Sequence, residues 1–372
     1  MRHNLTAIAL CTLGLLAAGP VRAQDIVVAT ASPLTGSSAQ DGQSCRNGAL
    51  VAADYINAKG GINGRKITVI SEDDRSDPKE AATLANKLVN TKDLLAVVGH
   101  FNSSCTLAGA PIYNRAKVVE ISPASSSPAV SNAGAYTCRV EVTDSQQGAF
   151  VAKWMVKDRG YKKIAILWEN DDYGLGLRDV VSKAVPELGG QVVAVESYYM
   201  GETKDFSSII TKVRGLNPDA VFIGGLYNEG ALIRKQMADV GWNPPFFGTE
   251  GLYSDAYPKL GGQAAEGTFF IGYWFPESPL PMVQEFRKLF QAKFGRDPGG
   301  FDANGFDAMM VIAKAMDLCG KNLSRDTLQK QLANQHVMGV TGDNTMDSHG
   351  DVTMKVPSKL TVKGGKIVLA QN

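Results

Sequence analysis

The segment GHFNSSCTLAGA, residues 99–110, places an amide and two hydroxyls where an apolar run ends and a helical pattern begins. The apolar run is Leu-Leu-Ala-Val-Val at 94–98, and the polar side chains are Asn102, Ser103 and Ser104. The amino end of a helix presents unpaired backbone N–H groups and a partial positive charge. Such a junction favours an anionic oxygen as its guest. For this segment alone, ordinary helix capping by Ser103 explains the pattern at least as well.

A second segment, AKVVEISPASSSPA at 116–129, repeats the arrangement with Ser125, Ser126 and Ser127 after an apolar strand. Turn chemistry around the prolines is the competing explanation here. In open parallel sheets, ligands bind beyond the carboxyl ends of the strands. We therefore expect 99–106 and 122–128 to be two halves of one site.

No catalytic or metal-binding motif accompanies these segments. The chain lacks G-x-S-x-G, H-E-x-x-H and the phosphate-loop pattern, and His100, His336 and His349 stand in no triad context. The acidic stretch DNTMDSHGD at 343–351 does not have calcium-loop spacing and is typical of a surface loop. The sequence therefore predicts a protein that is not an enzyme and has no cofactor or metal.

The first 23 residues have the features of a secretory signal peptide. Arg2 and His3 precede an apolar run at 7–18, which is too short for a membrane span, and Val-Arg-Ala at 21–23 resembles a cleavage site. Leu10 precedes Cys11, which argues against lipid attachment at that cysteine. We expect a soluble, exported protein that begins near Gln24.

The charge balance excludes several partners. The chain has 38 Lys and Arg against 37 Asp and Glu, and cleavage after residue 23 removes two arginines, which leaves 36 basic residues. No basic block of the kind that nucleic acid or an acidic membrane attracts is present, and no later apolar stretch reaches membrane length.

Four cysteines remain in the exported chain. In an oxidising compartment they can form up to two disulfides, in three possible pairings, or remain as buried free thiols. The sequence leaves these alternatives open for Cys45, Cys105, Cys138 and Cys319.

Strand and helix patterns alternate along the chain, which predicts an α/β protein with parallel, doubly wound sheets. This alternation of strands and helices is interrupted and resumes after TDSQQG at 143–148, so we expect two similar α/β domains. In the first part, strands are predicted at 25–30, 66–74, 94–98 and 117–121, and helices at 45–61, at 77–90 and from about 103. In the second part, strands are predicted at 162–169, 191–199 and 219–225, helices at 145–158, 175–187, 205–214 and 229–240, a helical region at 280–334, and a hairpin at 352–371 that turns at 363–366.

Eight segments, in order and in register, resemble the periplasmic solute receptors of branched-chain amino-acid ABC importers. The resemblance implies a type I periplasmic binding fold, in which two doubly wound lobes are joined by three crossover segments, here near 141–145, 271–277 and 340–356. The amino-terminal lobe would comprise 24–142 plus 275–345, and the carboxy-terminal lobe 143–274 plus 346–372. The segments are SPLTG, GQSCRNGALVAADYINAKGGINGRKI, EDDRSDPKEAATLANKLV, VVGHFNSS, ISPASSSP, TDSQQG, DYGLG and GTEG.

The resemblance also implies roles for five residues. Ser103 and Ser126 would hold the carboxylate of an amino-acid ligand, and the backbone carbonyl of Ala124 would help to hold its ammonium group. Tyr173 and Glu250 would reach across from the second lobe, with Glu250 as the counter-ion of the ammonium. Ser126 replaces the family's threonine and keeps the hydroxyl.

Several positions depart from the family pattern. Asp41 and Leu226 stand where leucine-type receptors have tyrosines, which puts the recognised side chain in doubt. Ser76 and Asn102 stand at the family's disulfide positions, so that bridge is absent.

Asp41, Phe101, Tyr227 and Trp274 are the candidate pocket walls, although plain core packing explains the three aromatic residues equally well. The resemblance implies a monomeric periplasmic receptor that binds an aliphatic or other hydrophobic amino acid and delivers it to a membrane permease with ATPase subunits. The alternative is the same fold binding a small non-amino carboxylate, such as an aromatic acid, or an amide. A buried Glu250 argues against a simple anion.

Overall fold

The computed structural model describes residues 25–333 and 335–371. The expected signal peptide and Cys11 lie outside this part of the chain. Within the described ranges, no helix combines the length and the apolar character that crossing a bilayer requires.

The first half of the chain forms a five-stranded parallel sheet with the order β2-β1-β3-β4-β5. The helices between these strands pack on both faces of the sheet, as the alternating pattern predicted. The strands are β1 (Ile26–Ser32), β2 (Ile67–Asp73), β3 (Leu94–Gly99), β4 (Val119–Ser122) and β5 (Thr137–Arg139), and the helices are α1 (Ala39–Ala58), α2 (Pro78–Val89) and α3 (Ser103–Ala116).

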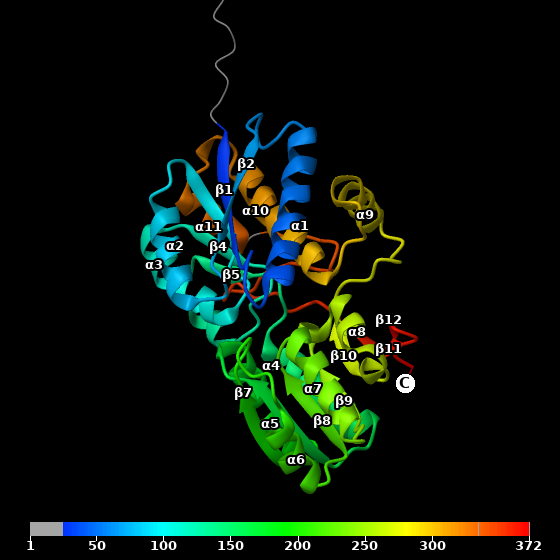
Figure 1. Cartoon of the computed structure of the whole chain (residues 1–372). Coiled ribbons are helices and arrows are strands. Elements are labelled where there is room, and N and C mark those ends of the chain that lie inside the picture. Colours follow the sequence, from blue (N-terminus) through cyan, green and yellow to red (C-terminus); the bar gives the residue numbers. More distant parts are fainter. Residues whose placement is uncertain (1–24, 334, 372) are drawn as a thin grey trace, which may run out of the picture.

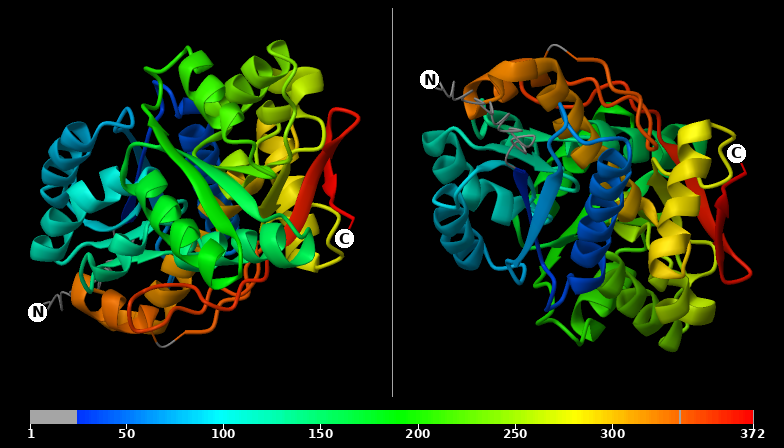
Figure 2. Two further views of the ribbon diagram at one scale, coloured as in Figure 1. Left: turned by 90° about the horizontal axis from the view of Figure 1, so that it is seen from below. Right: turned by 90° about the horizontal axis from the view of Figure 1, so that it is seen from above.

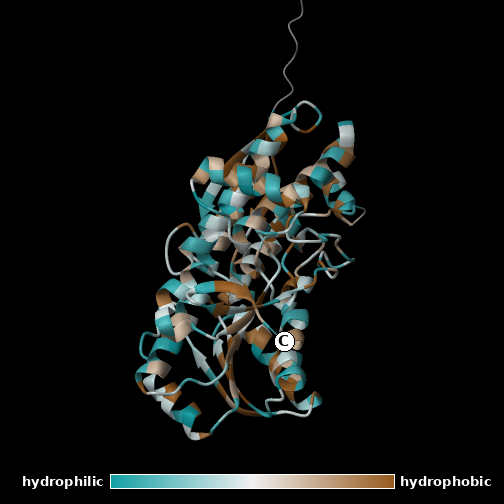
Figure 3. Ribbon diagram, turned by 90° about the vertical axis from the view of Figure 1, so that its right-hand side faces the viewer, coloured by the Kyte–Doolittle hydropathy of each residue, from teal (hydrophilic) through white to brown (hydrophobic). Residues whose placement is uncertain are grey.

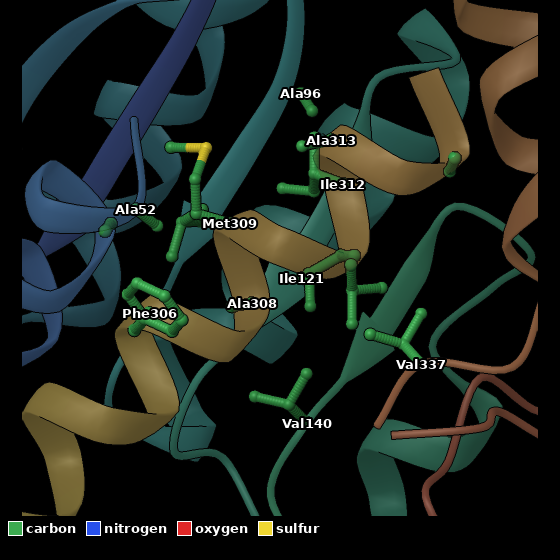
Figure 4. Close-up of a cluster of buried hydrophobic side chains, with 14 of the residues drawn as sticks. Ala52, Ala96, Ile121, Val140, Phe306, Ala308, Met309, Ile312, Ala313 and Val337 are labelled. Atoms are coloured by element: carbon green, nitrogen blue, oxygen red, sulfur yellow. The ribbon is translucent and has the colours of Figure 1, made fainter. Parts of the chain in front are cut away.

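Alternate residues of the first sheet enter two different hydrophobic cores, because side chains point to opposite faces along a strand. Val98 packs toward α1 and toward three helices from late in the chain, whereas its neighbour Val97 packs toward α2 and α3. Figure 4 shows the first of these cores, in which Phe306, Met309 and Ile312 of one late helix face Ile121. The late helices are α9 (Pro281–Phe294), α10 (Gly300–Cys319) and α11 (Arg325–Leu332).

The middle of the chain forms a second sheet that repeats this design. Its parallel part has the order β7-β6-β8-β9-β10, and the terminal hairpin β11–β12 extends it in antiparallel fashion beyond β10. In Figure 3 the strands of this sheet are predominantly hydrophobic, as expected for a sheet covered by helices on both faces. The strands are β6 (Lys163–Glu169), β7 (Gln191–Tyr198), β8 (Ala220–Gly224), β9 (Phe246–Gly248), β10 (Phe269–Gly272), β11 (Ser358–Lys363) and β12 (Lys366–Leu369).

Helices again cover both faces of the second sheet. One face packs against α4 and α5, and the other against α6, α7 and α8. The helices are α4 (Asp144–Lys153, continued by a π-helical turn, Trp154–Asp158), α5 (Asp172–Glu187), α6 (Ser207–Gly215), α7 (Tyr227–Asp239) and α8 (Ala256–Gly261).

The two sheets with their helices form two lobes, stacked one above the other in Figure 1 and seen end-on in Figure 2. Three connections pass between the lobes, from β5 to α4, from β10 to α9, and from α11 to β11. The carboxyl ends of the parallel strands in both lobes face the space between them, and this is where the sequence places its polar junctions.

The structure differs from the sequence prediction in several places. Helix α1 begins at Ala39 instead of 45, and Gly42 within it lies so close to Pro33 that a Cβ atom would be 2.0 Å from the Pro33 carbonyl oxygen. That glycine serves close packing and does not mark a helix end. Strands β5 and β10 and helix α8 were not predicted, since they have only three, four and six residues, and the hairpin begins at Ser358 instead of 352.

Candidate ligand-binding site

The five residues expected to touch a ligand all follow the carboxyl ends of strands. Ser103 is the first residue of α3, after β3, and Ala124 and Ser126 lie in the loop after β4. Tyr173 lies in the first turn of α5, after β6, and Glu250 follows β9 in a short 3-10 helix. The two lobes therefore present these residues to each other.

A small cavity lies between the lobes and is lined by residues of both. Four of the five expected residues belong to its wall, and Ser126 lies beside them in the same loop as Ala124. The wall consists of Phe101, Asn102, Ser103, Ala124, Tyr173, Leu226, Glu250 and Phe301.

The amino ends of α3 and α5 meet at this cavity from opposite lobes. The backbone N–H of Asp172 in α5 donates a hydrogen bond of 3.2 Å to the hydroxyl of Ser104 in α3. Both helix ends carry partial positive charge, but only α3 lacks a capping side chain, since Asp171 already accepts the Gly174 N–H of α5 at 2.8 Å. The site is therefore prepared for a negative group at this end.

The serines after β4 have different roles. The Ser125 hydroxyl is committed to the backbone oxygen of Phe101 at 3.0 Å and to Thr106. The Ser126 hydroxyl is buried and forms no hydrogen bond of ordinary geometry among the described residues, although it lies close enough to the Asp144 carboxyl to lower the pKa of that group. Ser103 accepts a bond from the backbone N–H of Ser127 at 3.3 Å, which leaves its own proton free to donate. Ser103 and Ser126 thus retain donors for a ligand, and Ser125 does not.

Tyr173 is held in place by its neighbours in the second lobe. Its hydroxyl lies 2.9 Å from the Thr249 hydroxyl. Burial raises the pKa of Tyr173 well above its ordinary value, and the nearby Glu250 carboxylate raises it further. The side chain is therefore a neutral phenol.

Glu250 presents to the cavity a buried carboxyl group with one unpaired oxygen. Only 6% of the residue is exposed, and its Oε2 atom has no hydrogen-bond partner in the described chain. Burial raises the pKa of Glu250 well above its ordinary value, and the charges of Glu141 and Asp144 add to this effect. A cation placed here would favour ionisation and lower this pKa.

Glu141 and Asp144, at the beginning of the second lobe, extend the acidic character of the site. Burial raises the pKa of Glu141 to about 7, although Lys355 opposes the shift. Glu141 accepts a hydrogen bond of 2.6 Å from Asn304, and burial also raises the pKa of Asp144, which the Ser126 hydroxyl opposes. Three buried carboxyl groups therefore lie close together.

A second small cavity adjoins the first and shares Glu250 and Phe301 with it. Trp274 lines this second cavity, and its indole N–H is anchored to the Pro298 carbonyl at 3.1 Å. The remaining lining residues are Glu141, Tyr253, Tyr273, Gly300 and Asn304.

The structure places the four candidate wall residues in different settings. Phe101 lines the first cavity and Trp274 the second, while Asp41 lines an adjoining groove. Tyr227 packs in the core of the second lobe, and the preceding Leu226 lines the cavity in its place.

Two cavity residues were not among the site residues expected from the sequence. Phe301, at the start of α10, forms an edge-to-face pair with Phe101 at 5.0 Å between ring centroids. Nothing in its local sequence indicates this role, because α10 reaches the site only through tertiary packing. Asn102 has a buried Oδ1 atom without a partner, and its position beside Ser103 was the available signal.

All four cysteines of the described chain are buried and free. The disulfide alternative left open by the sequence is thus not adopted. No group of three or more His, Cys, Asp or Glu side chains within the described ranges is arranged to hold a metal ion.

Two α/β lobes of equal topology, joined by three connections and enclosing a polar cavity at their strand ends, define a two-lobed solute-binding protein. The sequence comparison agrees, since residues 25–359 match the periplasmic binding protein family. The chain belongs to this family.

Individual relatives span nearly the whole chain. A Leu/Ile/Val-binding protein homolog from Brucella abortus (strain 2308) is 32% identical, over 92% of each chain. A leucine-binding protein from Thermotoga maritima superposes with a TM-score of 0.87 at 29% identity, covering 93% of this chain and 98% of that one. A branched-chain amino acid transporter substrate-binding protein from Streptococcus pneumoniae, in complex with isoleucine, superposes with a TM-score of 0.85 at 27% identity, covering 92% and 97%.

Proposed function

We propose that this protein is the extracytoplasmic receptor of an ABC importer and binds an α-amino acid between its lobes. The proposal rests on one observation. Hydroxyl and helix-end donors lie on one side of the cavity, and a buried carboxylate with an unpaired oxygen lies opposite them. An α-amino acid has complementary groups, a carboxylate and an ammonium, at a fixed short separation.

The carboxylate of the ligand would bind at the junction of α3 and α5. The hydroxyls of Ser103 and Ser126 are free to donate, the phenol of Tyr173 is neutral, and both helix ends favour negative charge.

The ammonium group would bind at Glu250, with the Ala124 carbonyl as a second acceptor. Three neighbouring carboxylates repel one another when they are ionised, and the ammonium group of a ligand would reduce this repulsion. The three residues are Glu141, Asp144 and Glu250. A simple carboxylate would add a further negative charge to this cluster. The acidic surroundings therefore favour an amino acid over the alternative of an aromatic or other non-amino acid.

The carbon chain of the ligand would lie against Phe101, Leu226 and Phe301. These walls suit aliphatic carbon atoms. The Brucella relative and the Thermotoga and Streptococcus proteins are named for leucine, for isoleucine and valine, or for branched-chain amino acids, which supports the same ligand class.

As a member of this family, the protein would act in the periplasm after removal of residues 1–23. It would close on its ligand by hinge bending at the three connections and deliver it, as a monomer, to a permease with ATPase subunits. It would bind its ligand without chemical change, since the site contains no nucleophile paired with a base.

The Glu250→Gln variant tests the proposal. It keeps the shape of the side chain and deletes the charge, and removing one partner of a desolvated charge pair costs about 2–5 kcal/mol. We expect leucine binding, measured by calorimetry on refolded, ligand-free protein, to weaken at least about thirtyfold. The des-amino analogue 4-methylpentanoate should lose less, because it lacks the ammonium.

Glu229→Gln is the matched control, since Glu229 is a buried glutamate of the same lobe that accepts a bond from the Gly201 backbone at 3.0 Å. It should leave the leucine affinity close to that of the native protein. If the native protein prefers 4-methylpentanoate to leucine, and Glu250→Gln binds it more tightly still, the ligand is a simple carboxylate and the amino-acid proposal is wrong.

A further inference from the structure

Asp41 is a second buried carboxylate without a partner, and the ligand groups assigned above leave it unused. Only 2% of the residue is exposed, and its Oδ2 atom has no hydrogen-bond partner in the described chain. Asp41 also forms no salt bridge there. It lies in the first turn of α1, one turn before Cys45, which packs in the same hydrophobic cluster as Phe101 and Phe301. Asp41 is therefore on the face of α1 that turns toward the ligand cavity.

Asp41 faces a polar groove that continues the ligand cavities. The groove lies between α1 of the first lobe and the segment around α8 of the second, and it shares Phe301 with both cavities. Tyr253 and Trp274 also line both the groove and the second cavity. A ligand that begins at Ser103 and extends past Phe301 would thus reach the groove.

The cations of the groove do not neutralise Asp41. Arg296 donates two hydrogen bonds of 2.8 Å to Asp302, and Arg287 is paired with Asp297 at 3.2 Å. Lys259, on α8, is exposed and forms no salt bridge in the described chain. The Asp302 carboxylate, which Arg296 neutralises, still raises the pKa of Asp41, and no cation of the described chain is paired with Asp41 itself.

The closed arrangement of the lobes brings Asp41 against the second lobe. The Asp41 charge contributes to raising the pKa of Tyr227, which begins α7 of that lobe. Leu226, the residue before it, lines the first cavity. Asp41 therefore stands where the far end of a ligand would be enclosed on closure.

We propose that Asp41 binds a cationic nitrogen at the far end of the ligand's side chain, so that the preferred ligands are α-amino acids with an aliphatic chain ending in an ammonium group. This inference rests on the proposed function, since the carboxylate and α-ammonium groups must first be fixed at Ser103 and Glu250. The apolar walls hold the methylene groups, and Asp41 accepts the terminal N–H bonds. Leucine would fill the apolar part and leave Asp41 unpaired.

Two matched pairs of ligands isolate the terminal charge. Lysine and norleucine have the same carbon chain with and without the terminal nitrogen, and ornithine and norvaline form a second pair. Calorimetry on ligand-free protein should show that the native protein binds the charged member of at least one pair ten or more times more tightly. Asp41→Asn should bring that ratio close to one, and Asp41→Leu should reverse it.

Asp255→Asn is the matched control, because Asp255 is an exposed acid that lines the same groove. It should leave the ratio unchanged, which separates a direct contact from a general effect of charge. Thermal melting of each variant checks that it folds, and removal of a buried unpaired carboxylate should not lower the melting temperature.

The outcomes distinguish this inference from the proposed function. If the native protein prefers norleucine and norvaline, and Asp41→Leu leaves the ratios unchanged, the inference is wrong while amino-acid binding stands. Glu250→Gln should weaken both members of each pair by the same factor, because both carry the α-ammonium. If neither pair nor leucine binds at all, the proposed function fails and the inference fails with it.

Discussion

Asp172 and Ser104 join the two lobes directly, through a hydrogen bond of 3.2 Å from the Asp172 backbone N–H to the Ser104 hydroxyl. Each residue lies in the first turn of its helix, so the bond brings two positively polarised helix ends to the same point. Two like helix ends repel each other unless a negative group lies between them. An anionic group of the proposed ligand, bound beside these helix ends, would stabilise this contact further.

Ser104→Ala should weaken ligand binding without changing ligand preference. A hydrogen bond between neutral groups contributes about 0.5–1.5 kcal/mol, which corresponds to roughly a two- to tenfold loss of affinity. The loss should appear as faster dissociation in stopped-flow measurements, because the bond joins the two lobes and would break when they separate. Ser208→Ala, an exposed serine in the first turn of α6, is the control and should have no effect. An unchanged dissociation rate in Ser104→Ala would show that the contact does not stabilise closure.

Ser103→Ala and Ser126→Ala should each reduce affinity more strongly. Hydrogen bonds to a charged group contribute about 1.5–3 kcal/mol, so a loss of roughly ten- to a hundredfold is expected in calorimetric titrations with leucine or lysine.

Ser125→Ala is the informative comparison for these two variants. The Ser125 hydroxyl donates a hydrogen bond to the backbone carbonyl of Phe101. Removing it should lower the melting temperature and leave the ligand affinity nearly unchanged. If Ser103→Ala and Ser126→Ala behave in the same way as Ser125→Ala, the two serines have only structural roles.

Glu141 should make the stability of the ligand-free closed form depend on pH. Its pKa is raised by burial from 4.5 to about 7, so between these values the folded protein keeps a proton that the unfolded chain has released. The contribution of Glu141 to the free energy of unfolding therefore falls as pH rises from 4.5 to 7, by at most about 3 kcal/mol. Urea unfolding of wild type and Glu141→Gln at pH 5 and pH 7 should show that the variant gains relative stability at the higher pH.

The exposed Glu187→Gln serves as the control for that comparison and should follow the wild-type profile. A Glu141→Gln variant that becomes relatively less stable at pH 7 than at pH 5 would mean that the ionised carboxylate is favoured by its partners Lys355 and Asn304.

All four cysteines should react with a thiol reagent, and they should do so only after the protein unfolds. Burial raises the pKa of Cys45 and Cys105 well above the ordinary value and that of Cys138 to about 12, so the native protein has little reactive thiolate. A thiol reagent at pH 8 should label almost none in the native protein and four in guanidinium. Detection of only two thiols after unfolding would reveal a disulfide.

Much of the fold follows from local sequence. The alternation of apolar runs with helical patterns predicted the parallel strands and most helices, because side-chain periodicity records which face of an element is buried. Asp77 and Pro78 marked the start of α2, where the Asp77 side chain accepts a bond of 2.7 Å from Lys79 N–H. Strand β5 was missed because three residues are too few to show a period.

The sequence by itself also placed Ser103 and Ser126, the residues predicted to bind an anionic group, at strand ends whose position in a doubly wound sheet is set by topology. The tertiary structure decided which neighbouring side chain faces the ligand. Leu226 lines the cavity while Tyr227 enters the core, and the Ser125 hydroxyl is bound to backbone while that of Ser126 is free. Neighbouring residues in a chain point their side chains in different directions. In a loop, the local sequence pattern does not specify which of two neighbours points into the cavity.

The far end of the site depended entirely on long-range packing. Phe301 reaches the cavity because α10, late in the chain, packs closely against α1, where a Cβ on Gly48 would lie only 1.8 Å from the Asp302 carbonyl. The same packing places Asp41 in a groove where no described side chain pairs with it. The free energy of a buried charge depends on every group around it, and those groups come from both lobes and from distant parts of the chain.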